Sequence, residues 1–235
     1  TDSYKMHLGG LLAMAVEAVG PTPELVKLRR ERGGIMATGH IGMWQVGPFL
    51  AEWREMPPFY MARAEEPNPL VQQWEQKFRD RLRIIYTTGS PFSALTIAKV
   101  LREGSLVGMQ IDRVLGDSAV TVQMCGRPVR FPIGPALLSR VTEAPLIPSF
   151  FAIDDSGDKP KLVHHVGPAI FVEKTRDRDA DVRRAVEQLV AVYEAMVRRY
   201  PTQWYQFFDF FDQPEAVVAL DAAPPRPLAP SATER

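Results

Sequence analysis

Short apolar runs alternate with longer stretches of helical periodicity, and this alternation constrains the fold more than any other feature of the chain. The runs with the length and composition of buried strands are residues 33–39, 58–63, 83–89 and 105–112. The stretches with helical periodicity between them are residues 42–53, 68–82 and 90–104. Parallel strands need crossover connections of about a dozen residues or more, usually helices. The pattern therefore predicts an α/β fold with a mixed, mostly parallel central sheet flanked by helices.

The rest of the chain predicts further elements of a single domain. They are an amphipathic helix at 3–19, a short helix ending at Arg32, a hairpin at 119–134 that turns at Gly126-Arg127-Pro128, a helix at 135–144, strands at 145–154 and 159–172, and a long helix at 179–199. Ser90 is the expected N-cap of the helix at 90–104. The α/β domain is expected over residues 1–214, and the proline-rich residues 215–235 are expected to be disordered.

Composition excludes several classes of protein. Lys plus Arg equals Asp plus Glu at 28 each, so no basic excess points to nucleic acid. The single cysteine, Cys125, rules out an internal disulfide framework, and the four histidines show no zinc-site spacing, so neither a metal nor a cofactor is expected. Residues 8–20 are apolar but too short to span a bilayer and are interrupted by Glu17. A membrane anchor preceding Thr1 stays an open question.

His40 follows Gly39 at the end of the predicted strand 33–39, and Asp112 and Arg113 follow the predicted strand 105–112. Ligands of open α/β sheets usually bind beyond the carboxyl ends of the strands. We therefore expect these side chains to lie near one sheet edge and to be candidates for chemistry. The plainer alternatives are a histidine that hydrogen-bonds a turn and a solvated surface ion pair.

Two groups of arginines could bind an anion. Arg79 lies with Lys77, Arg81 and Arg83 on one helix and the strand after it, and a guanidinium suits a phosphate or a developing oxyanion. Arg127, Arg130 and Arg140 surround a proline-rich turn before a helix, where an anionic head group or phosphopantetheine phosphate would fit. The alternative for both groups is a solvated charged surface.

Residues 202–211, "TQWYQFFDFF", form a dense aromatic segment that contains Trp204. Such a segment could wall an acyl-chain groove or enter a membrane interface. Closing the hydrophobic core explains it equally well. The adjacent His164 and His165 face opposite sides of a strand, so they cannot chelate a metal from one face and are expected to be structural.

Five segments occur in the order typical of one enzyme family. They are "GHIGMWQVG" at 39–47, "NPLVQQWEQKFRDRL" at 68–82, "SLVGMQIDR" at 105–113, "VQMCGRPVRFPIGPALLSRVTEAPLIPSF" at 122–150 and "QWYQFF" at 203–208. Together, over roughly residues 3–211, they resemble the bacterial lipid A biosynthesis acyltransferases, which include the lauroyl and myristoyl transferases and the phosphatidylinositol mannoside acyltransferases. The first segment is similar to the family's His-x-Gly-Asn-Trp-Glu/Asp motif.

The resemblance implies a glycerolipid-acyltransferase-like fold and acyl transfer from an acyl carrier protein or coenzyme A thioester to a hydroxyl, or less often an amine, of a membrane lipid. It also implies a place at the membrane surface on the cytoplasmic face of the bacterial inner membrane, peripheral or anchored by a preceding segment. The candidate catalytic residues are His40 as general base, Gln45, Arg79 as oxyanion donor, and Asp112. The candidate substrate-binding residues are Trp44, Arg113, Arg127, Arg130 and Trp204.

Gln45 departs from the family motif, because it stands where the motif has a carboxylate. Three explanations stay open. Asp112 or another carboxylate could support His40, the glutamine could be a substitution introduced to trap substrate, or the chain could bind acyl lipids without efficient turnover. The Phe-Phe-Gly turn of the family is also altered, to "MCG" at 124–126. The sequence therefore supports two hypotheses, an acyltransferase and a catalytically weak binding member of the same fold.

Overall fold

The computed structural model describes residues 16–20, 23–47, 56–65, 69, 72–73, 76, 83–87, 92–114 and 117–212. Seven strands of this part form one sheet in the order β1-β9-β8-β2-β5-β3-β4. These strands are β1 (Val16–Val19), β2 (Gly34–Thr38), β3 (Phe59–Arg63), β4 (Arg83–Tyr86), β5 (Leu106–Gln110), β8 (Leu146–Asp154) and β9 (Lys161–Val166). All neighbouring strands pair in parallel except β8 and β9, which are antiparallel. The mixed, mostly parallel sheet is thus confirmed.

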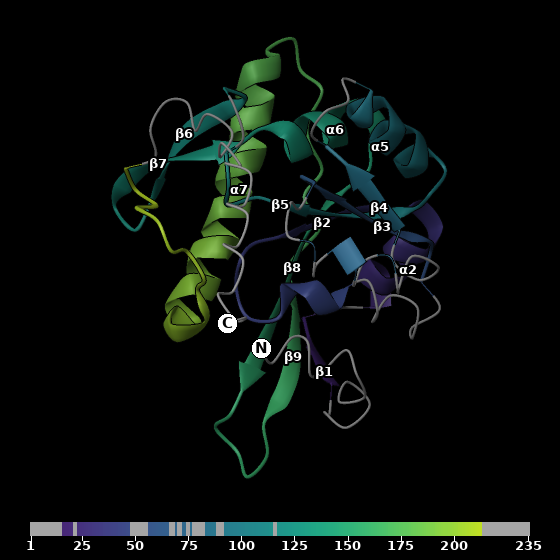
Figure 1. Cartoon of the computed structure of the whole chain (residues 1–235). Coiled ribbons are helices and arrows are strands. Elements are labelled where there is room, and N and C mark those ends of the chain that lie inside the picture. Colours follow the sequence, from purple (N-terminus) through teal and green to yellow (C-terminus); the bar gives the residue numbers. More distant parts are fainter. Residues whose placement is uncertain are drawn as a thin grey trace, which may run out of the picture.

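Helices cover both faces of this sheet (Figure 1). The described helices are α2 (Pro23–Arg32), α5 (Ser93–Arg102), α6 (Gly134–Thr142) and α7 (Arg178–Arg199). Successive residues of β2 point to opposite faces, so Ile35 packs into the large core beneath α5, α6 and α7, whereas Met36 packs with Leu25 of α2 on the other side. Burial on both faces explains why the strands are continuous apolar runs.

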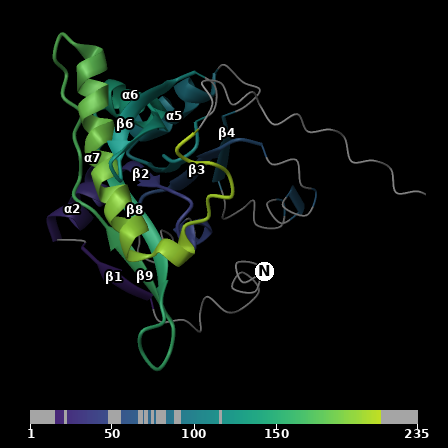
Figure 2. The same cartoon turned by 90° about the vertical axis from the view of Figure 1, so that its left-hand side faces the viewer.

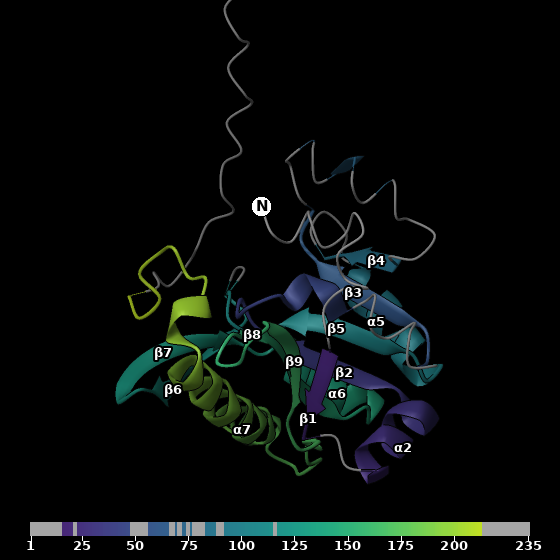
Figure 3. The same cartoon turned by 90° about the horizontal axis from the view of Figure 1, so that it is seen from below.

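The hairpin lies outside the main sheet. Strands β6 (Ala119–Met124) and β7 (Arg127–Pro132) pair with each other and pack against α7. Figure 3 shows α7 and this hairpin together on one side of the molecule, with β3 and β4 on the other. The segment that follows α7 returns beside it toward the hairpin (Figures 1 and 2). Phe210 of that segment packs edge-on against Phe131 of β7, with ring centroids 5.9 Å apart.

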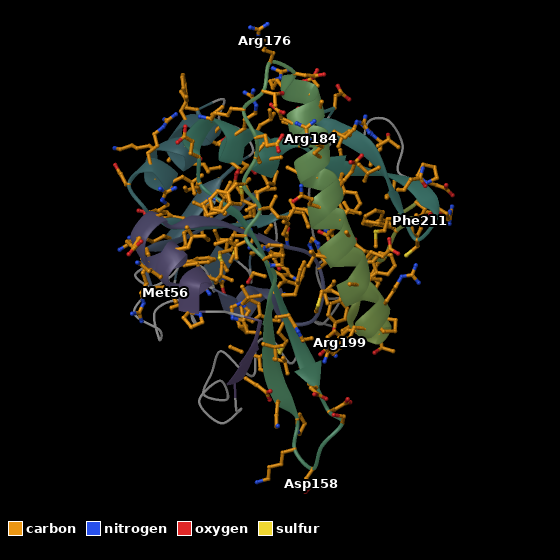
Figure 4. All side chains as sticks on the ribbon, turned by 180° about the vertical axis from the view of Figure 1, so that it is seen from behind. Met56, Asp158, Arg176, Arg184, Arg199 and Phe211 are labelled. Carbon is orange, nitrogen blue, oxygen red and sulfur yellow. The ribbon has the colours of Figure 1, made fainter. Side chains whose placement is uncertain are left out.

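Strands β8 and β9 form a hairpin whose loop projects from one end of the molecule (Figure 1). Asp158 lies at the tip of their connecting loop, at the end of the molecule opposite Arg176 (Figure 4). The two histidines of β9 have structural partners, as expected, because His164 stacks on Phe151 with ring centroids 4.1 Å apart and His165 Nε2 lies 2.9 Å from the hydroxyl of Tyr200.

Three local predictions need correction. Residues 16–19 were expected at the end of a helix but form β1, because pairing with β9 supplies backbone hydrogen bonds that the local pattern does not reveal. The hairpin turns one residue earlier than expected, at Cys125 and Gly126, whose positive φ values of 53° and 75° suit a two-residue turn. The helix expected from Ser90 begins at Ser93.

Several predictions fall outside the described residues. They concern residues 3–15, most of the stretches 42–53 and 68–82, Ser90 and the tail 215–235. Of the stretch 42–53, a 3₁₀ turn, η3 (Trp44–Val46), is described. No helix of the described residues has both the length and the apolar character needed to cross a bilayer.

Candidate active site

The register of two neighbouring strands brings His40 and Asp112 together. Thr38 at the end of β2 is paired in parallel with Gln110 at the end of β5. His40 and Asp112 each lie two residues beyond this pair, and the N–H of Ile111 donates to the carbonyl of Thr38 over 2.8 Å. Both side chains therefore leave the sheet at the same edge, as expected from the ends of the two predicted strands.

The two residues are joined by two hydrogen bonds. His40 Nδ1 lies 2.8 Å from Oδ1 of Asp112, and the backbone N–H of His40 donates to Oδ2 over 2.6 Å. The carboxylate of Asp112 is fully buried and the His40 side chain is 9% exposed. A buried carboxylate is tolerated only with hydrogen-bond donors around it, and here it holds both the ring and the backbone of the histidine.

Two further side chains donate to the Asp112 carboxylate. The hydroxyl of Tyr193, in the C-terminal half of α7, donates to Oδ2 over 2.7 Å, and Nε2 of Gln206 donates to the same oxygen over 2.6 Å. The indole N–H of Trp204 in turn donates to the Tyr193 hydroxyl over 2.8 Å. Burial and the neighbouring charge of Asp112 raise the pKa of Tyr193 far above its ordinary value, so the phenol stays protonated and acts as a donor.

Gly39 is required by this packing. A Cβ atom at this position would lie 2.4 Å from Cε2 of Tyr193 and 2.8 Å from Oδ2 of Asp112. Both separations are shorter than van der Waals contact, so only glycine lets the backbone pass between the tyrosine and the carboxylate. The glycine before the histidine therefore has a steric role in the site.

Trp44 and Gln110 complete the surroundings of the His40 ring. The indole of Trp44 meets the imidazole edge-on, with ring centroids 5.3 Å apart. Gln110 Nε2 lies 3.0 Å from His40 Nε2, the nitrogen that faces away from Asp112. Gln45 is half-buried in η3, and within the described residues no hydrogen bond joins it to His40. Among the described residues, the carboxylate that bonds the His40 ring is therefore that of Asp112.

The segment after α7 is fixed to the histidine loop by backbone hydrogen bonds. The N–H of Tyr205 donates to the carbonyl of His40, and the N–H of Gly42 donates to the carbonyl of Gln203, each over 2.8 Å. The Gln203 side chain bonds the N–H and the carbonyl of Ile153 on β8, at 2.9 and 2.7 Å. These bonds place Trp204 and Gln206 beside Asp112.

The predicted arginines do not converge on His40 within the described residues. The guanidinium of Arg113 lies 5.7 Å above the ring of Phe208, and that of Arg127 lies 4.5 Å above Phe211 and 3.5 Å from the carboxylate of Asp212. Arg130 is half-buried in β7. Arg79 lies outside the described residues.

Arg140 was expected beside Arg127 and Arg130 at an anion site, but its side chain is bound to other residues of the protein. It is paired with the buried Asp181 at 3.1 Å and donates to the carbonyl of Thr175 over 2.8 Å. Among the described residues, no group of histidine, cysteine and acidic side chains could hold a metal ion. The site therefore consists of an acid-supported histidine enclosed by hydrogen-bonding and aromatic side chains.

Residues 20–212 match the family described as bacterial lipid A biosynthesis acyltransferase. The chain belongs to this acyltransferase family. It is 25% identical to phosphatidylinositol mannoside acyltransferase of Mycolicibacterium smegmatis over 194 residues, which cover 80% of this chain and 58% of the relative. It is also 25% identical to phosphatidylinositol mannoside acyltransferase of Mycobacterium tuberculosis over 178 residues, which cover 74% of this chain and 52% of the relative. The chain thus spans a little over half the length of these curated relatives.

Three residues of the site in this acyltransferase-family chain are not predicted by its sequence. The sequence predicts Tyr193 only as part of the long helix at 179–199, and it predicts no role for Gln110 or Gln206. Tyr193 could have been recognised from its residue type, since a phenol on an otherwise aliphatic buried helix face needs a hydrogen-bond partner. No local pattern marks the two glutamines, because their partners are 70 and 94 residues away.

Proposed function

We propose that the chain transfers a fatty acyl group from the thioester of an acyl carrier protein or coenzyme A to a hydroxyl, or less often an amine, of a membrane lipid or glycolipid, with His40 as the general base. The observation that carries the proposal is the buried pair of His40 and Asp112, in which the carboxylate holds Nδ1 at 2.8 Å. Membership of the acyltransferase family supports the class of reaction.

The chemistry requires His40 to move one proton twice. Nε2 takes the proton from the acceptor hydroxyl as its oxygen attacks the thioester carbonyl carbon, and the carbonyl electron pair moves to oxygen. When the carbonyl re-forms, the carbon–sulfur bond breaks and the leaving sulfur takes the proton from Nε2. A general base at such a step typically contributes about 10²–10⁴-fold to the rate.

Asp112 supplies the negative charge that the imidazolium needs between these two transfers. It accepts from Nδ1 of His40, which fixes the tautomer with a free electron pair on Nε2. The carboxylate reaches the ring from the end of β5, so Gln45 need not carry a charge. Of the three explanations for Gln45, this geometry favours support of His40 by Asp112.

The oxyanion donor is proposed from the family resemblance alone. Arg79 would donate to the carbonyl oxygen as it gains charge, and such a donor is typically worth about 10²–10³-fold in rate. Arg113 is the described arginine closest in sequence to the site and would bind an anionic group of the donor or of the acceptor.

The aromatic segment gives a surface suited to a membrane. Trp204 donates to Tyr193 and Gln206 donates to Asp112, whereas Tyr205, Phe207 and Phe208 are exposed. Arg113 stacks on Phe208 of this surface and Arg127 stacks on Phe211 of the same segment, where both would attract anionic lipid head groups. We propose that this exposed group of Tyr205, Phe207 and Phe208 meets the cytoplasmic face of the bacterial inner membrane.

The test is acyl transfer from a radiolabelled acyl thioester to lipids of a bacterial extract. A labelled lipid should form with the unmodified chain, and its rate of formation should fall about 10²-fold or more in His40→Ala and in Asp112→Asn. Asp117→Asn is the matched control, because Asp117 is exposed. Undiminished product in His40→Ala would rule out the base assignment.

A second candidate is a binding module that holds an acyl lipid or acyl carrier protein with little turnover, and Gln45 is the observation that favours it. In that case Gln45→Glu gains no activity over an inactive parent, and His40→Ala binds the acyl thioester as tightly as the parent does. An active parent, with Gln45→Glu within about threefold of it, would support the enzyme. Strong turnover that appears only in Gln45→Glu would show that Asp112 does not replace the missing acid.

A further inference from the structure

The reactive nitrogen of His40 is already hydrogen-bonded in this structure. Gln110 Nε2 lies 3.0 Å from His40 Nε2, while Nδ1 is bound to Asp112 and the Trp44 indole packs against the imidazole at an interplanar angle of 70°. The His40 side chain is only 9% exposed. A hydroxyl therefore cannot reach Nε2 unless the amide of Gln110 moves away.

The direction of this hydrogen bond follows from the carboxylate. The groups around Oδ2 of Asp112 are donors: the His40 N–H, the Tyr193 hydroxyl and the Gln206 amide. An ionised carboxylate only accepts, so Nδ1 of His40 carries the ring proton and Nε2 has a free electron pair. The Gln110 side chain must then turn its N–H toward that pair, since its oxygen would repel it.

We propose that Gln110 caps the general base and is displaced by the acyl acceptor. The inference deepens the proposed function and rests on it. Gln110 is the last residue of β5, two residues before Asp112, so both side chains leave the strand on the same side and hold opposite nitrogens of one imidazole. Gln110 is half-buried, so part of the residue reaches solvent.

The cap discriminates between a lipid acceptor and water. Either one must break the hydrogen bond between Gln110 and Nε2 before its proton can be removed. A lipid acceptor offsets this loss with binding energy from the rest of its structure, and a lone water molecule has no such contribution. The cap thus suppresses hydrolysis, in which water attacks the thioester carbonyl and releases the free acid and the thiol, whenever no acceptor is bound.

The first arm of the test measures how the thioester is divided between two products. Gln110→Ala opens Nε2 to water, so the ratio of thioester hydrolysis without acceptor to lipid acylation at saturating acceptor should rise about 2–10-fold, the range expected for one neutral hydrogen bond. The KM for the acceptor should fall. Gln123→Ala is the matched control, because Gln123 is an exposed glutamine of β6. An unchanged ratio in Gln110→Ala would overturn the cap.

The second arm does not need turnover. Gln110→Leu keeps the bulk that excludes water but cannot donate, so the ¹⁵N resonance of His40 Nε2 should move toward that of a free electron pair. The chain has four histidines, and the signal is assigned by its loss in His40→Ala. Thermal melting of both Gln110 variants checks that they fold. An unmoved resonance in a folded Gln110→Leu protein would overturn the cap.

The two arms separate this proposal from the proposed function. If the parent chain forms no acylated lipid but the resonance moves, the proposed acyl transfer fails while the capping hydrogen bond stands. If the parent chain is active and both the product ratio and the resonance stay unchanged, the cap fails while the proposed function stands.

Discussion

The hydroxyl of Tyr193 donates to the carboxylate of Asp112 over 2.7 Å, across 81 residues of sequence. It links the C-terminal half of α7 to the residues just beyond β5, and the indole N–H of Trp204 donates in turn to the Tyr193 hydroxyl. Because Tyr193 also packs against Phe131 and Phe150, its ring and its hydroxyl have separable roles.

Tyr193→Phe should therefore lower kcat by about 10-fold while the ring packing is kept, because one hydrogen bond to the charged Asp112 is lost. The measurement is the rate of lipid acylation, with circular dichroism to confirm the fold. Tyr200→Phe is the matched control, since it removes a tyrosine hydroxyl that bonds His165 at 2.9 Å instead. Equal rates for Tyr193→Phe and the parent chain would contradict the role of the phenol.

Gly39→Ala should both destabilise the protein and reduce activity. The new methyl group would sit 2.4 Å from the Tyr193 ring and 2.8 Å from Asp112, so these groups must shift. Overpacking of this kind should lower Tm by about 2–10 °C. In Gly134→Ala, the matched control, the added Cβ atom has open space within 4 Å and Tm should not fall. A Tm for Gly39→Ala equal to that of the parent would show that the loop relaxes freely.

The sequence predicts the strands that carry the site better than the contacts between its side chains. The runs at 33–39 and 105–112 are apolar and end in polar residues, so the strand ends and the shared edge of His40 and Asp112 are locally encoded. The local motif pointed instead to position 45 for the acid. The acid lies at Asp112 instead because its contact with His40 depends on the register of β2 with β5. No local sequence pattern determines that register.

The contacts of Tyr193 and Gln206 could not be predicted for a related reason. Their partners depend on where α7 crosses the sheet and on how the following segment returns, and both are set by tertiary packing. The secondary structure of residues 16–19 also depends on tertiary packing. A short apolar stretch is compatible with a helix or a strand, and pairing with β9 makes it a strand.

Asp181 should make stability depend on pH in the acid range. Burial alone would raise the pKa of its carboxyl, but hydrogen bonds from Thr175 and the nearby Arg140 guanidinium outweigh this and hold the pKa below the ordinary value of 3.8. A lowered pKa in the folded state gives a stabilisation that is complete above 3.8 and is lost as the pH falls through the folded pKa.

Asp181→Asn should therefore have a lower Tm than the parent at neutral pH, and the gap should close in strong acid. Thermal melts across a pH series check this. Asp179→Asn is the control, because Asp179 is exposed two residues away. A gap of constant size at every pH would show that the charge of Asp181 contributes nothing.

The exposed aromatic group should bind anionic membranes. Phe207 is 88% exposed and Phe208 43%, and burying one phenylalanine side chain in an apolar phase is worth about 1.5–3 kcal/mol. Phe207→Ser should weaken binding to phosphatidylglycerol vesicles by about 10-fold in a sedimentation assay. Binding of the parent should also fall as salt is added, because the guanidinium of Arg113 lies 5.7 Å above the ring of Phe208. Phe171→Ser is the control, since Phe171 is 53% exposed but lies outside the segment. If both variants lose binding equally, this surface has no special affinity for the membrane.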